Sequence, residues 1–223
     1  MMIIGSFLLG ILLALLGSGI ESRLVKTYVE IKEPKCWPVY IVPLVTGALS
    51  VGIYYLEGAS LETLGKILLI SLLIELSCFD IKYMLLPTKL IYGGVVVAFL
   101  WRAARTWKAQ EAYFILNGII GAIVGYGLFW LIFYGSKVLF KKEGLGFGDV
   151  RLMGLIGFCI GIEHLFLMMI IASLIAVAIG GMLYIIRGKS EAFPFGPSLC
   201  VGAISMMLLG EQIVSLYLRG LGF

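Results

Sequence analysis

The chain has 223 residues, of which 61% are hydrophobic and 13% charged, and its formal net charge is +4. Soluble domains carry about 25% charged residues, so this composition excludes a water-soluble enzyme with a single anchor and indicates a polytopic membrane protein. No polar stretch is long enough to form a second, soluble domain, and we expect one domain over residues 1–223. The positive charge fits basic loops beside a membrane, and it gives no indication of nucleic-acid binding.

A helix needs about 20 apolar residues to cross a bilayer, within a range of about 17–25. Eight candidate helices meet or approach this length, at residues 3–20, 38–56, 66–86, 89–101, 112–136, 150–162, 165–186 and 197–218. The fourth and sixth are short, so either neighbouring residues extend them or they do not cross the whole bilayer. The N-terminus lacks the basic residues of a signal peptide, and we expect its apolar run to be retained as the first helix. The sequence therefore predicts an all-α membrane bundle of about eight helices.

Lysine and arginine predict how these helices are oriented, because cytoplasmic loops are richer in both residues. Most of them lie in alternate loops, at residues 21–37, 81–89, 136–151 and 187–192. We expect these loops in the cytoplasm and both termini outside. The cluster of Arg102, Arg105 and Lys108 does not fit this pattern. Two explanations stay open for residues 101–111: an amphipathic segment on the membrane surface, or a different number of spans.

Two aspartates lie where a membrane protein rarely has them, since a carboxylate at bilayer depth costs at least a few kcal/mol. Asp80 ends the third candidate helix, and Asp149 follows Gly146 and Gly148 at the start of the sixth. Both lie on the predicted cytoplasmic side, so they can face each other if the two helices pack together. Each alone also has a simpler explanation, with Asp149 as the N-cap of its helix and Asp80 as a charge at a helix end.

Two neighbouring carboxyls in a low-dielectric site can hydrolyse a peptide bond without a metal. They cannot both ionise, so they share one proton and titrate as a pair. The charged member takes a proton from water, while the neutral member protonates the substrate carbonyl. Glu75 is a third acid, but it lies about 140° around the helix from Asp80 and need not face it. No metal is expected, because His164 is the only histidine and the four cysteines form no CxxC pair.

Three motifs, in order over about residues 66–210, resemble the type IV prepilin peptidases, which are membrane aspartic proteases of the GxGD class. The motifs are Asp80-Ile with Pro87, Gly146-Phe-Gly-Asp149 followed by Gly157 and Gly161, and Pro194-Phe195-Gly196-Pro197. Arg151 stands where the family usually has lysine. The resemblance implies that Asp80 and Asp149 are the catalytic pair and that Gly146 and Gly148 shape the site. It further implies that the segment from Pro194 to Pro197 helps to seat the substrate strand.

The resemblance implies an enzyme of the cytoplasmic (inner) membrane that cuts the leader from type IV prepilins or pseudopilins at the cytoplasmic face. The cut falls after a glycine and before a hydrophobic stem. Residues 66–218 would form the catalytic helices, and residues 1–65 an N-terminal part. Proteolysis would need no cofactor. Neither the particular prepilin nor the oligomeric state is indicated by the sequence.

Two positions depart from the family pattern. Thr88 replaces the Asp or Asn that many members have after the proline, although threonine can still cap the next helix. The first cytoplasmic loop, 21–37, contains only Cys36. Larger members have two CxxC pairs there, associated with zinc and with N-methylation from S-adenosylmethionine. The sequence therefore supports leader cleavage better than methylation.

Two other functions stay open. A preflagellin peptidase or a presenilin-like protease would use the same pair of acids. A small proton- or cation-coupled carrier would instead use Asp80, Glu75 and Asp149 as an ion pathway, and it would have inverted repeats and helices broken at the midplane. No convincing internal repeat is visible, and both aspartates lie near one surface, which favours the peptidase.

Overall fold

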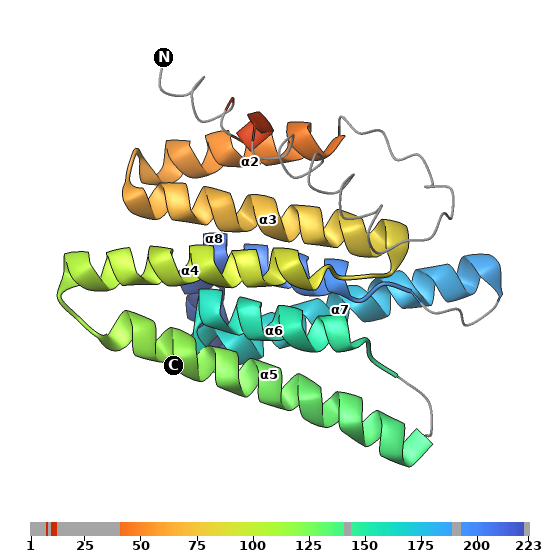
Figure 1. Cartoon of the computed structure of the whole chain (residues 1–223). Coiled ribbons are helices and arrows are strands. Elements are labelled where there is room, and N and C mark those ends of the chain that lie inside the picture. The colour runs from red at the N-terminus through yellow and green to blue at the C-terminus, as the bar shows by residue number, and fades with distance from the viewer. Residues whose placement is uncertain (1–7, 9, 13–40, 141–143, 189–192, 221–223) are drawn as a thin grey trace.

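The computed structural model describes residues 8, 10–12, 41–140, 144–188 and 193–220, and the regular elements in these ranges are helices (Figure 1). They are α2 (Ile41–Glu57), α3 (Leu61–Tyr83), α4 (Thr88–Ala109), α5 (Tyr113–Phe140), α6 (Phe147–Ile160), α7 (Ile162–Arg187) and α8 (Gly196–Gly220). Most of the expected first helix, 3–20, and the whole loop 21–37 lie outside the described residues.

Local signals set the ends of α3 and α4. α3 begins at Leu61, earlier than expected, because Ser60 caps it and accepts the N–H of Thr63 at 3.0 Å. α4 continues to Ala109, so neighbouring residues do extend the short fourth span. At about 1.5 Å per residue its 22 residues reach about 33 Å. Residues 101–109 therefore belong to this helix and do not form a separate segment on the membrane surface.

α6 stays short and forms the centre of the bundle. Its 14 residues span about 21 Å, which is less than the roughly 30 Å of a bilayer core. Leu152, Met153 and Ile156 are fully buried, as expected for a helix that is apolar on all sides. Figure 1 shows α6 between α4 and α5, and it also contacts α7 and α8. The residue at its first turn is therefore held from several directions.

The backbones of α5 and α6 meet at small residues. Gly121 of α5 and Gly157 of α6 face each other so closely that a Cβ on either would overlap the carbonyl oxygen of the other. A Cβ on Gly125, about one turn further along α5, would lie 2.9 Å from the carbonyl oxygen of Met153. Gly121 and Gly125 are four residues apart, a small-xxx-small spacing that allows close helix packing.

Replacing Gly157 by alanine is expected to destabilise the protein by about 1–3 kcal/mol, the usual cost of overpacking, because the new methyl group has only backbone to push against. Thermal unfolding in detergent would measure the loss as a lower Tm. Gly135→Ala is the matched control on α5, since its Cβ would meet nothing within 4 Å. Equal Tm values for the two variants would contradict the close packing of α5 on α6.

Large apolar side chains cover much of the outside of the bundle. In α7, for example, Val177 and Ile185 are 73% and 83% exposed. Such a surface is costly in water but suits a lipid environment. In the described part of the chain, α5, α7 and α8 each contain a segment long and apolar enough to cross a membrane. The prediction of an all-α, multi-pass membrane bundle is confirmed.

Candidate active site

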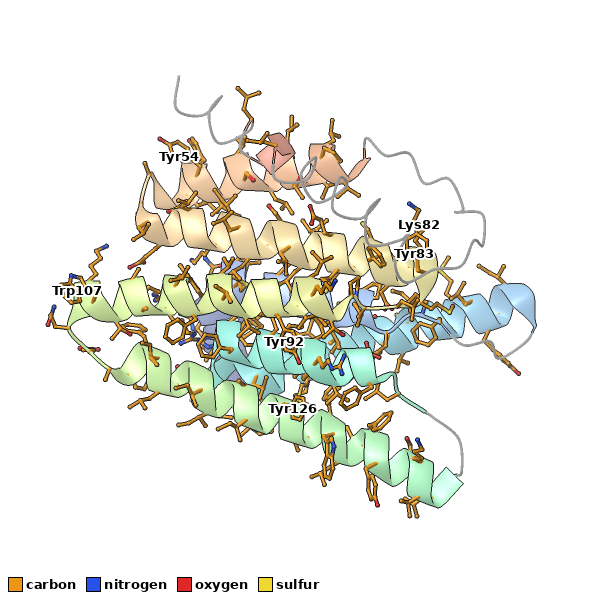
Figure 2. The ribbon with its side chains drawn as sticks, in the orientation of Figure 1. Tyr54, Lys82, Tyr83, Tyr92, Trp107 and Tyr126 are labelled. Carbon is orange, nitrogen blue, oxygen red and sulfur yellow. The ribbon has the colours of Figure 1, made fainter. Side chains whose placement is uncertain are left out.

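The two aspartates singled out by the sequence come together at one end of the bundle. Asp80 lies in the last turn of α3, and Asp149 lies in the first turn of α6. They are only 6% and 8% exposed, and the charge of Asp80 acts on Asp149. Figure 2 marks this end by Lys82 and Tyr83, which follow Asp80 in α3. The fold therefore creates a buried pair of carboxyls from two separate helices.

Asp80 is held by the start of α8. The backbone N–H of Gly196 donates to Asp80 Oδ2 at 2.9 Å. A Cβ on Gly196 would lie 2.6 Å from the same oxygen, so a residue with a side chain could not bring its backbone this close. An N–H in the first turn of a helix also carries the positive end of the helix dipole. This donor is therefore well suited to a carboxylate.

Asp149 is held differently. The N-cap of α6 is Gly146, so Asp149 is the third residue of the helix, and the interpretation of Asp149 as the N-cap is wrong. Its backbone N–H donates to the carbonyl oxygen of Gly146 at 3.1 Å. Its Oδ1 atom is buried and has no hydrogen-bond partner among the described residues. A buried polar atom of this kind requires a proton, water or ligand as a partner.

The glycines before Asp149 pack the start of α6 against its surroundings. A Cβ on Gly148 would lie 2.9 Å from the Cβ of Leu86, in the loop that follows α3. A Cβ on Gly146 would lie 3.1 Å from Asp149 Oδ2. The absence of side chains therefore brings the loop after Asp80 close to the turn that carries Asp149.

The segment from Pro194 to Pro197 lies beside the pair, but its four residues do different things. Gly196 makes the hydrogen bond to Asp80. Phe195 stacks on Phe129 of α5, with ring centroids 6.3 Å apart, and anchors the segment. The two prolines are half-buried on either side. The sequence located this segment near the site, but it gave no signal for the contact between Gly196 and Asp80.

Thr88 and Arg151 form a link that the sequence did not indicate. The expected cap by Thr88 is wrong, because the N-cap of α4 is Pro87, without a side-chain hydrogen bond. Thr88 Oγ1 instead accepts a hydrogen bond from Arg151 Nη1. The Arg151 guanidinium also lies over the ring of Phe147, 4.6 Å from its centroid. Arg151 thus ties the start of α4 to the start of α6.

Glu75 lies half-buried within α3, more than one turn before Asp80. Among the described residues, no group of three or more His, Cys, Asp or Glu side chains could hold a metal ion. Cys36 and its loop are outside the described residues. The described site thus brings together two carboxyls and a backbone N–H.

These features define a polytopic helical membrane protein with two buried carboxyls at one end of its bundle. The sequence model of the type IV leader peptidase family matches residues 67–181, slightly more than half of the chain. The chain belongs to this family. No solved structure matches it significantly.

Several curated proteins are similar over most of the chain, each with the name prepilin leader peptidase/N-methyltransferase. The protein of Aeromonas hydrophila is 30% identical over 184 residues, which cover 80% of this chain and 60% of that protein. The protein of Pseudomonas putida is 30% identical over 177 residues, covering 78% and 60%. The protein of Pseudomonas aeruginosa is 29% identical over 185 residues, covering 82% and 62%. The chain thus spans about 60% of the length of these relatives.

Proposed function

We propose that this protein is a membrane aspartic endopeptidase that removes the leader from type IV prepilins or pseudopilins. The observation that carries the proposal is the meeting of two buried carboxyls, Asp80 and Asp149, from separate helices. Family membership and the names of the relatives support the substrate class. The distribution of basic loops supports an active site near the cytoplasmic face, with residues 66–218 as the catalytic part.

The surroundings of the two carboxyls support different roles for them. Asp80, which accepts the Gly196 N–H, is the charged member and takes a proton from the attacking water. Asp149 is the protonated member and gives its proton to the peptide carbonyl oxygen, while the water oxygen bonds to the carbonyl carbon. The resulting diol collapses and the C–N bond breaks. Asp80 passes its proton to the leaving nitrogen, and Asp149 regains one from a diol hydroxyl, which restores the pair.

An apolar groove supports a substrate with a hydrophobic stem. The groove has a volume of about 640 Å³ and lies between α4, α5 and α6. Tyr92 of α4 and Tyr126 of α5 line it, and both are labelled in Figure 2 near α6. Phe147 and Arg151, which flank Asp149 in the sequence, line it as well. Because the groove continues to the turn that carries Asp149, we place the stem of the substrate there.

Replacing Gly127 by tryptophan is expected to lower kcat/KM for a full-length prepilin about 10-fold, since a large side chain would block part of the groove. Gly127 lines the groove, and its Cβ would meet nothing within 4 Å, so the fold can accept the new side chain. Gly181→Trp, at an equally open position in α7, is the matched control. A short peptide that lacks the stem should be cut equally by both variants. If Gly127→Trp lost as much activity on the short peptide as on the full-length prepilin, the placement of the substrate stem in the groove would be wrong.

Methylation is a separate question from cleavage. The names of the relatives combine a peptidase with an N-methyltransferase. In this chain the loop 21–37 has no CxxC pair, and it lies outside the described residues. We therefore assign cleavage to the described helices and leave methyl transfer from S-adenosylmethionine to direct measurement.

A cleavage assay in proteoliposomes tests the proposed function. A prepilin with glycine before the cut site is incubated with the protein, with and without S-adenosylmethionine, and the product masses are read. Loss of the leader is the expected result, and an added methyl mass would extend the activity to methylation. If a folded protein left several prepilins and pseudopilins uncut, the carrier would become the better interpretation of the two acids.

A further inference from the structure

A polar cavity lies at the end of the bundle opposite the acid pair. Its volume is about 340 Å³, and side chains from several helices line it. Its basic residues are Lys66 of α3, Arg102 and Arg105 of α4, and His164 of α7. Figure 2 shows Trp107 at this end of α4, far from Lys82 at the end of α3 that carries Asp80. The cavity is therefore separate from the proposed active site.

Arg102 is a buried cation in the wall of this cavity and is only 4% exposed. Its Nη1 donates to the carbonyl oxygen of Phe114, and its Nη2 donates to that of Cys159 at 2.9 Å. A guanidinium has five N–H donors, and the Nε of Arg102 has no partner among the described residues. The ion pairs seen in this part of the chain, Lys66 with Glu57 and Lys108 with Glu62, do not include it.

Arg105, about one turn further along α4, is in a similar position. Its guanidinium lies over the rings of Trp101 and Phe114, 5.2 Å and 4.7 Å from their centroids. Its Nε is also buried without a hydrogen-bond partner in the described ranges. Ring faces stabilise the cation, but the Nε–H still lacks an acceptor.

The charged side chains that line the cavity leave a small excess of positive charge, and Glu163 of α7, which is not in the lining, also acts on Arg102. Lys66 and Glu57 form an ion pair, so their charges cancel. Glu211 is the other acid in the lining, and it is exposed. The two positive charges of Arg102 and Arg105 exceed the single negative charge of Glu211. Buried cations in membrane proteins are costly and usually mark a site that receives an opposite charge.

We propose that this cavity binds a phosphate group through Arg102 and Arg105. Guanidinium groups bind phosphate oxygens with paired N–H donors. The bundle end lies where helices meet the membrane surface, so an anionic phospholipid or free phosphate can supply this group. The site goes beyond the proposed cleavage and does not depend on it.

Binding is measured on the full chain, purified in detergent and freed of lipid. Inorganic phosphate and phosphatidylglycerol are titrated separately, with Tm and native mass spectrometry as the readouts. Arg105→Gln is expected to weaken binding about 10-fold, the usual effect of losing one charge-assisted hydrogen bond. Arg105→Lys should lose less binding affinity than Arg105→Gln, because it keeps the positive charge. Lys108→Gln is the matched control, because Lys108 lies on the same helix, pairs with Glu62 and does not line the cavity.

Saturable binding of phosphatidylglycerol alone would support a lipid head group as the ligand, and binding of phosphate alone would support the free ion. Arg102→Gln provides a second test, with folding checked by Tm because Arg102 also binds two backbone carbonyls. No saturable binding of either probe would overturn the proposal, as would equal binding by the parent and Arg105→Gln. Prepilin cleavage is not read in this experiment, so its outcome is independent of the proposed function.

Discussion

Replacing Asp80 or Asp149 by asparagine is expected to reduce prepilin cleavage by about 1,000-fold or more. An amide has nearly the shape of a carboxyl but can neither take a proton from water nor give one to the substrate. Because the two acids share one proton and act as a unit, each single variant should be about as inactive as the double variant. Initial rates of leader removal in proteoliposomes would measure the effect.

The same variants should remain folded, which separates a catalytic loss from a structural one. Asp149 Oδ1 has no partner among the described residues, and a neutral amide of nearly the same shape replaces the protonated acid of the proposed pair. The Tm of Asp149→Asn is therefore expected to stay close to that of the parent. Glu75→Gln, which removes an acid from the same helix as Asp80, should keep cleavage within a few-fold. Normal cleavage by either Asp variant would rule out the acid-pair mechanism.

Replacing Gly196 by alanine is expected to slow cleavage about 10- to 100-fold, because misplacing a reacting group by about 1 Å can cost that much. The alanine Cβ would lie 2.6 Å from Asp80 Oδ2, which is closer than van der Waals contact allows. The carboxylate or the start of α8 must then move. The backbone N–H is still present in this variant, so the experiment tests the position of the carboxylate and not the loss of its donor.

Gly181→Ala is the control for this variant, since its Cβ would meet nothing within 4 Å. Both variants would be compared by the rate of leader removal and by Tm. Full activity of Gly196→Ala at an unchanged Tm would show that close contact with α8 does not position Asp80.

Apolar runs located most helices well, because a span must be apolar over a fixed length. The expected ranges 112–136 and 165–186 correspond to α5 and α7 with small shifts at their ends. The end of α4 was missed, because Arg102 interrupts the apolar run. The acceptors of Arg102 are the carbonyl oxygens of Phe114 and Cys159. A hydropathy pattern cannot reveal partners in other helices.

In the candidate site, too, features of a single helix could be predicted from the sequence, whereas contacts between helices could not. Asp80 and Asp149 stood out because charge is rare in apolar helices, and their meeting followed from helix topology. The donor from Gly196 to Asp80 could not be predicted, since the two residues lie in different helices with no shared pattern. The partner of Arg151 was missed for the same reason, because Thr88 looked like a helix cap when only its own neighbours were considered.

The hydrogen bond between Gly196 and Asp80 joins positions 116 residues apart. During synthesis α3 and α6 leave the ribosome before α8, since membrane helices are made from the N-terminus onwards. Until α8 enters the bundle, Asp80 lacks this donor. On the proposed function, a nascent chain therefore cannot cut other proteins while it is being inserted. Completion of the bundle would itself activate the protease.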